Sequence, residues 1–179
     1  MSDFHRRLEE EIPRLRRYAR ALTRNATRAD DLVQDTLTRA VQKAHLWQPG
    51  TDLRAWLFTI MHNQNVNQIR HAIRDSSTVN LETCSQSLVA TTDPTASRQL
   101  RELERALGQL PQDQRQVILL VGLEGMSYEQ AAAILQVPVG TIRSRLSRGR
   151  DALRKLMGMG DRRPSSASEH HLEPTPLAA

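Results

Sequence analysis

Cysteine is nearly absent from the sequence: Cys84 is the single one among 179 residues, so no internal disulfide can form. It stands in a polar stretch, and the six histidines show no ligand spacing with it or with one another, apart from the adjacent pair His170 and His171. A structural zinc site needs about four such ligands at short spacings. We therefore expect no metal site and no cofactor, and the cysteine usage favours a cytoplasmic location.

Long apolar runs are also missing. No segment approaches the roughly 18 apolar residues that cross a bilayer, and the first twenty residues mix arginine and glutamate with isolated apolar residues. We expect neither a signal peptide nor membrane insertion. The sequence has no glycine-rich phosphate loop, no Gly-x-Ser-x-Gly elbow and no carboxylate pair beyond acids near helix starts. It therefore predicts a protein that is not an enzyme.

Aromatic residues make up 3% of the chain, and no strand-like alternation of useful length occurs. The sequence therefore predicts an all-α fold. Its 25 Lys and Arg residues outnumber 20 Asp and Glu, for a net charge of +5, which suggests a polyanionic partner. Nucleic acid and an acidic membrane surface both qualify at this point.

Residues 1–74 are expected to form a first helical module. Apolar residues recur at helical spacing from 3 to 24, but Pro13 interrupts them and predicts a break or kink, with the better helix beginning at Pro13. A turn is expected at 25–28, before a helix capped by Asp30 or Asp31. A Pro-Gly loop then leads to a third helix capped by Asp52.

Helical periodicity disappears over residues 75–97, where Ser, Thr, Asn and Gln dominate. We interpret this stretch as a flexible linker, across which two modules fold separately and move relative to each other. Residues 98–158 are expected to form a second module of four helices, including one over 112–124. Residues 159–179 hold too few apolar side chains to fold and are expected to be a disordered tail.

A helix-turn-helix is predicted within the second module. Ser127 and Gln130 have the spacing of a capping box, which predicts an alanine-rich helix beginning at Ser127. A short turn at 137–140 precedes a helix from Thr141 to about Met157. Six cations lie on that helix beside one acid: Arg143, Arg145, Arg148, Arg150, Arg154 and Lys155, with Asp151. A basic helix in this position suits the major groove, although an ordinary solvated basic face is the simpler alternative.

Two sets of stretches together resemble the extracytoplasmic-function (ECF) sigma factors of the bacterial sigma-70 family. Residues 29–36 and 52–60 resemble that family's region 2. Residues 110–117, 126–132 and 139–145 are similar to its region 4. The resemblance implies a factor that binds core RNA polymerase through its beta and beta-prime subunits, directs promoter-specific initiation and has an anti-sigma partner.

The resemblance also implies which residues act. Core binding would use Asp31, Gln34 and Asp35, and region 2 would read the −10 element through Trp47, Asn63, Asn67 and Arg70. Region 4 would read the −35 element through Thr141, Arg143, Ser144, Arg145, Ser147 and Arg148. Asn63, Asn67 and Arg70 share one helix face, where amides can bond base edges. Instead of contacting DNA, Trp47 could pack in the helical core, which is the alternative role for this residue.

Two other functions remain open at this point. A stand-alone helix-turn-helix regulator would bind an operator without polymerase. A sigma-mimicking adaptor would capture an anti-sigma factor without initiating transcription. Known mimics of that kind carry a phosphoacceptor receiver domain, and the strand-helix alternation of such a domain is not seen in this sequence.

Overall fold

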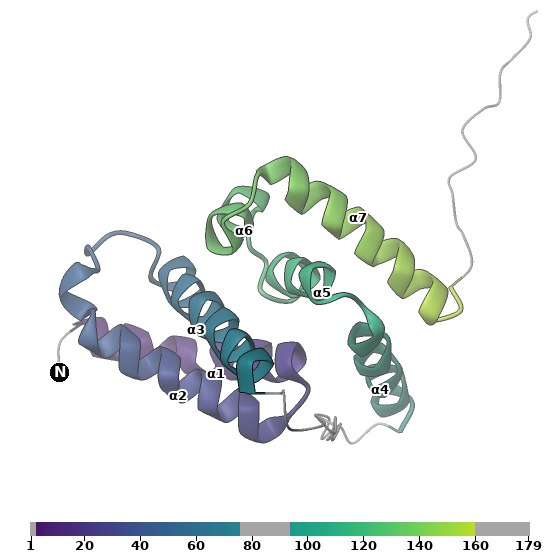
Figure 1. Cartoon of the computed structure of the whole chain (residues 1–179), viewed down its shortest axis with the longest axis horizontal. Coiled ribbons are helices and arrows are strands. Elements are labelled where there is room, and N and C mark those ends of the chain that lie inside the picture. Colours follow the sequence, from purple (N-terminus) through teal and green to yellow (C-terminus); the bar gives the residue numbers. More distant parts are fainter. Residues whose placement is uncertain (1–2, 76–93, 160–179) are drawn as a thin grey trace, which may run out of the picture.

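The structure, a computed structural model, describes residues 3–75 and 94–159, and within those ranges every regular element is a helix (Figure 1). The first module comprises α1 (Asp3–Thr23), α2 (Ala26–Gln42), the short 3-10 helix η1 (Ala44–Leu46) and α3 (Leu53–Asp75). The second comprises α4 (Pro94–Gln109), α5 (Gln112–Ile118), the π-helical turn η2 (Leu119–Leu123), α6 (Tyr128–Leu135) and α7 (Val139–Leu156). The predicted all-α fold of two helical modules is confirmed. The predicted linker and tail lie almost wholly outside the described residues.

A break or kink was predicted at Pro13, and the break is wrong, because α1 continues through this residue. Proline removes one backbone donor, so a carbonyl one turn earlier loses its helical partner. Pro13 lies on the exposed face of α1, opposite the buried Leu15 and Tyr18. Water can satisfy the released carbonyl there, and the apolar stripe on the other face holds the helix together.

The start of α2 also differs from the prediction. Asn25 is the N-cap, and its side-chain oxygen accepts a hydrogen bond from the N–H of Arg28 at 2.9 Å. Asp30 and Asp31 therefore lie within the helix and do not cap it. The predicted cap of α3 is confirmed, since Asp52 Oδ1 accepts from the N–H of Ala55 at 3.1 Å.

The helix predicted over 112–124 is divided by a wider turn. The N–H of Glu124 donates to the carbonyl of Leu119 at 3.0 Å, five residues earlier, and the N–H of Met126 donates to Leu120 at 3.0 Å. Gly125 takes a positive φ of 68°, which a glycine adopts without strain. This turn, η2, buries the side chains of Glu124 and Met126.

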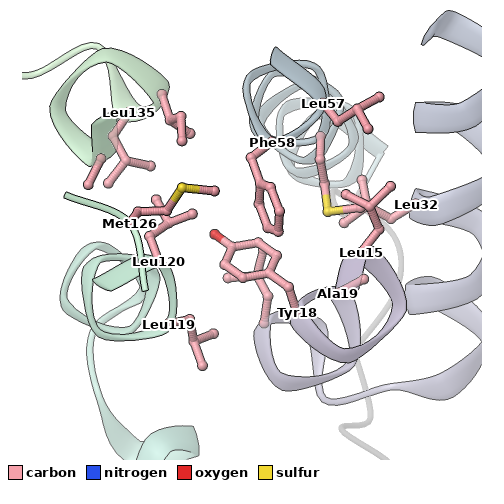
Figure 2. Packing of buried hydrophobic residues seen from close by; sticks show 14 of the residues in the cluster. Leu15, Tyr18, Ala19, Leu32, Leu57, Phe58, Leu119, Leu120, Met126 and Leu135 are labelled. Carbon is pink, nitrogen blue, oxygen red and sulfur yellow. The ribbon is translucent and has the colours of Figure 1, made fainter. Parts of the chain in front are cut away.

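A continuous apolar core joins the two modules. Tyr18 of α1 and Phe58 of α3 pack edge to face, with ring centroids 5.0 Å apart. Figure 2 shows these rings facing Leu120 and Met126 of the second module. The two modules therefore pack against each other in this structure, and their separate folding stays a prediction.

Candidate nucleic-acid and polymerase interfaces

The polymerase-binding residues predicted on α2 share an exposed face. Asp31, Gln34 and Asp35 are exposed, whereas Leu32 and Val33 are buried. Because Asn25 caps the helix, neither acid is needed at its N-terminus. The face is thus a negatively charged, amide-bearing surface available to a cationic partner.

Gln68 of α3 extends this surface, which sequence reasoning missed. Its Nε2 donates to Asp35 Oδ2 at 2.9 Å and so ties α3 to α2. The sequence predicts that Gln68 belongs to the same helix as Asn67. It contains no signal that the Gln68 side chain faces a neighbouring helix. The contact fixes the orientation of one predicted site residue.

The three polar residues predicted on α3 are brought together as expected. Asn63, Asn67 and Arg70 are exposed, and their spacing puts them on one side of the helix. His62 next to them is half-buried and its Nδ1 has no hydrogen-bond partner. Burial lowers the pKa of His62 below its ordinary value, so this helix presents amides and a guanidinium beside a neutral imidazole.

Trp47 lies elsewhere, in the core of the first module, with 9% of its surface exposed. Its ring lies 5.6 Å from that of Phe4, and the guanidinium of Arg7 lies 5.1 Å from the ring centroid. Both contacts match the packing alternative. Stacking on a base would require the indole to leave these neighbours, so we do not assign that role to Trp47.

The predicted helix-turn-helix is present. Ser127 Oγ accepts from the N–H of Gln130 at 3.1 Å, and Gln130 Oε1 accepts from the N–H of Ser127 at 2.9 Å, which completes the capping box. Gln136 ends α6 in the left-handed conformation. Pro138 is the N-cap of α7, so that helix begins at Val139, two residues before the predicted start.

The residues predicted to read the −35 element fall into two groups. Arg143, Ser147 and Arg148 are exposed on α7, whereas Thr141, Ser144 and Arg145 are partly buried. The hydroxyl of Ser144 donates to the carbonyl of Thr141 at 3.0 Å, and Arg145 Nε pairs with Asp113 of α5 at 3.1 Å. The first group offers donors to a ligand, and Arg145 fastens α7 to α5.

A hollow of about 250 Å³ lies where the beginning of α6 meets α7. Its lining includes the hydroxyl-bearing Tyr128 and the guanidinium groups of Arg143, Arg150 and Arg154. Asp151 also lines it and pairs with Arg154 at 2.9 Å. The excess of positive charge suits an anion the size of a phosphate.

Gly149 sets the distance between α5 and α7. It is buried, and a Cβ at this position would lie 2.6 Å from Ile118 Cδ1. A larger residue here would require the Ile118 side chain to shift, and Gln114 Cβ, 3.3 Å from the added Cβ, leaves little further room. Farther along α7, the side chain of Leu156 is 43% exposed.

Within 3–75 and 94–159, no group of histidine, cysteine, aspartate and glutamate could hold a metal ion. No helix in these ranges is long and apolar enough to span a bilayer.

Two family models match the chain, one for each module. Residues 8–62 match the sigma2 domain of PhyR, and residues 100–153 match sigma-70 region 4. The fold and its surfaces therefore define a two-module protein of the sigma-70 class.

Relatives identify the family more closely. The chain is 44% identical over 146 residues to the ECF RNA polymerase sigma factor EcfG of Rhodopseudomonas palustris, covering 82% of this chain and 80% of that protein. It also resembles the sigma factor RpoE in its complex with the anti-sigma factor NepR from Bartonella quintana, with a TM-score of 0.77 and 38% identity over 90% of this chain and all of that one. CnrH in complex with the cytosolic domain of CnrY matches with a TM-score of 0.63 and 28% identity, over 88% and 89% of the two chains. The chain belongs to the ECF RNA polymerase sigma factors.

Proposed function

We propose that this sigma factor binds core RNA polymerase through the α2 face of Asp31, Gln34 and Asp35. We further propose that α3 reads the −10 element and α7 the −35 element. The observation that carries the proposal is that one chain presents an acidic face on α2 and a basic, exposed face on α7, each on a separate module. An initiation factor needs both partners at once, whereas a stand-alone regulator needs the second face alone.

The two DNA-reading faces are proposed to work differently. Asn63, Asn67 and Arg70 would meet bases of a melted strand, since amides bond base edges and arginine stacks or holds phosphate. Arg143, Ser147 and Arg148 would enter the major groove of duplex DNA. Sigma factors are generally not enzymes, and we propose the same of this chain, which would act in the cytoplasm where polymerase works.

We also propose an anti-sigma partner. Two of the similar structures are sigma factors bound to anti-sigma factors, RpoE with NepR and CnrH with CnrY. Both matches cover most of this chain, which supports a partner of the same kind here.

A sigma-mimicking adaptor is the second candidate, and it is favoured by the match of residues 8–62 to the sigma2 domain of PhyR. An adaptor that binds an anti-sigma factor needs neither base-reading amides on α3 nor an exposed basic α7. This chain has exposed amides on α3, Asn63 and Asn67, and exposed arginines on α7, among them Arg143 and Arg148. It is also 44% identical to a protein named as an ECF sigma factor.

Reconstituted run-off transcription separates these functions. Core polymerase with this protein should give specific transcripts from a library of promoter fragments, and polymerase alone should give none. Binding to duplex DNA without any transcript would support a regulator. Binding to an anti-sigma factor with neither DNA binding nor transcripts would support the adaptor.

A further inference from the structure

Arg24 follows the last residue of α1 in a conformation that arginine rarely takes. Its φ is 57°, in the left-handed region, and its N–H donates to the carbonyl of Arg20 at 2.9 Å. Glycine or asparagine usually occupies this position, because a larger side chain is strained there. The hydroxyl of Thr23 donates to the carbonyl of Asn25 at 3.0 Å and accepts from its N–H at 3.4 Å, which fixes the turn around Arg24. The sequence thus keeps an arginine where the backbone disfavours one.

The side chain of Arg24 lies against Gly108 of α4, which is a second locally unfavourable residue. Gly108 lies inside the helix, where glycine is less favourable than alanine. A Cβ at this position would overlap the Arg24 guanidinium, whose Nη1 donates to the Gly108 carbonyl at 3.4 Å. Gly108 therefore leaves the space that the guanidinium occupies. Two residues that each weaken their own backbone fit one another here, which is more typical of a binding site than of a contact that stabilises the fold.

Arg115 brings a second guanidinium to the same carbonyl. Its Nη2 donates to the Gly108 carbonyl at 2.9 Å, so this oxygen accepts from two arginines. Arg115 also donates to three further carbonyls at 2.8, 2.9 and 3.2 Å, those of Leu107, Leu110 and Leu22. These carbonyls lie at the ends of α4 and α1, where each helix carries a partial negative charge. The charge of Arg115 is therefore used to satisfy two helix ends.

The charge of Arg24 has no comparable use. Among residues 3–75 and 94–159, its guanidinium makes one long hydrogen bond, to Gly108, and no carboxylate pairs with Arg24 or Arg115. Burial, and after it the charge of Arg24, lower the pKa of Arg115 below its ordinary value, as expected for two cations that face each other without an anion. Arg24 is half-buried, and most of its N–H donors are available to a ligand.

We propose that Arg24, placed against Gly108 and beside Arg115, forms a binding site for a small phosphate-bearing anion. Guanidinium groups bind phosphate through paired N–H donors, and an anion at this point would relieve the repulsion between the two cations. Two cations at one point suit a single phosphate group, whereas a nucleic-acid backbone needs a row of exposed cations such as that of α7. Binding at this site needs no residue of α3 or α7 and is independent of promoter recognition.

The two unfavourable residues provide test variants that should not weaken the fold. Arg24→Gly removes the donor and relieves the strained φ, whereas Gly108→Ala keeps every charge but fills the space of the guanidinium. Without ligand, both variants should melt at or above the temperature of the unmodified protein. Arg28→Ala is the matched control, because it removes an exposed arginine from the first turn of α2 and leaves Arg24 and Gly108 in place.

The experiment uses thermal melting and titration calorimetry of the full chain and the three variants, with inorganic phosphate and separately with ADP, at an ionic strength held constant with potassium chloride. Phosphate at about 100 times its dissociation constant should raise the melting temperature of the unmodified protein and of Arg28→Ala by several degrees. Arg24→Gly and Gly108→Ala should lose most of this shift and bind phosphate at least about tenfold more weakly. Tighter binding of ADP than of phosphate would identify a nucleotide as the ligand, and equal or weaker binding of ADP would identify the free ion.

Several results would overturn the site. A phosphate effect that does not saturate, or that is the same in all four proteins, would be a general effect of salt. An equal loss in Arg28→Ala would mean that any arginine nearby suffices. Melting of both Arg24→Gly and Gly108→Ala below the unmodified protein without phosphate would show that the contact serves the fold. Scrambled duplex DNA that displaces phosphate, and that binds Arg24→Gly more weakly than the unmodified protein, would assign these cations to nucleic acid instead.

Discussion

Individual side chains on α7 are proposed to have different roles in DNA binding. Arg148 is exposed on the turn next to Arg143 and Ser147, whereas Lys155 lies almost two turns farther along. Base-edge contacts give sequence specificity, and phosphate contacts give affinity without it. The structure therefore offers a pair of cations on one helix whose loss should have different consequences.

Arg148→Ala should weaken binding to the cognate −35 duplex by about 1 to 3 kcal/mol and change binding to scrambled DNA little. Lys155→Ala should weaken both alike and reduce the salt slope by roughly one. Fluorescence anisotropy on both duplexes at two salt concentrations measures the contrast. Equal losses on both duplexes for both variants would show that α7 supplies charge without reading sequence.

His62 predicts a dependence of stability on pH. Its folded pKa is lowered by burial, so the unfolded chain binds its proton more readily. Below the ordinary pKa of about 6.5, protonation therefore favours unfolding, and stability should fall as the pH falls from about 7.5 to 5.5. His62→Gln should flatten this part of the curve of unfolding free energy in urea. An unchanged slope would mean that His62 is not responsible.

At the scale of single helices, α2 provides a surface that can be reversed in charge without disturbing its core. Asp31→Lys with Asp35→Lys should abolish association with core polymerase and leave the helical signal intact, because both residues are exposed and Asn25 caps the helix. Pull-down by core polymerase measures this. Asp30→Lys, on the same helix but facing Arg20 at 3.8 Å, is the control. Undiminished pull-down of the double variant would exclude this face.

The helices also show what local sequence can predict. Ser127 with Gln130 and Asp52 were recognised as caps because their partners lie within one turn. Pro13 misled the prediction, since whether a proline breaks a helix depends on what the opposite face packs against. Asn25 was missed because Asp30 and Asp31 are equally good caps by residue type. Burial of Ala29 favours an earlier start of α2, but that burial is known only from the packing.

For the molecule as a whole, periodicity predicted two modules but not their contact. Tyr18 and Phe58 lie beside the apolar stripes that face their own module, so no repeat marks them as partners of Leu120 and Met126. Glu124 resembled an ordinary residue at a helix end. Which apolar surface packs against which depends on three-dimensional shape. The exposed faces of α2, α3 and α7 follow from helical spacing alone and do not depend on the contact between the modules.

Asp52 caps α3 through its Oδ1, and its Oδ2 accepts a hydrogen bond from Gln130 Nε2 of α6 at 2.7 Å. This shared carboxylate has a consequence that calorimetry can measure. When Asp52 and Gln130 part, each keeps the hydrogen bonds that cap its own helix, so neither helix needs to fray. Separation of the two modules would then expose the apolar side chains of Tyr18, Phe58, Leu120 and Met126 to water, while the backbone hydrogen bonds within the helices are kept. Water ordered around newly exposed aromatic and aliphatic groups raises heat capacity. Arg17→Ala removes the guanidinium that pairs with the buried Glu124 of the second module at 2.9 Å, whereas Arg6→Ala removes an exposed pair with Asp3. Arg17→Ala should accordingly show a higher native-state heat capacity with unchanged ellipticity, and a smaller heat-capacity step on melting than Arg6→Ala.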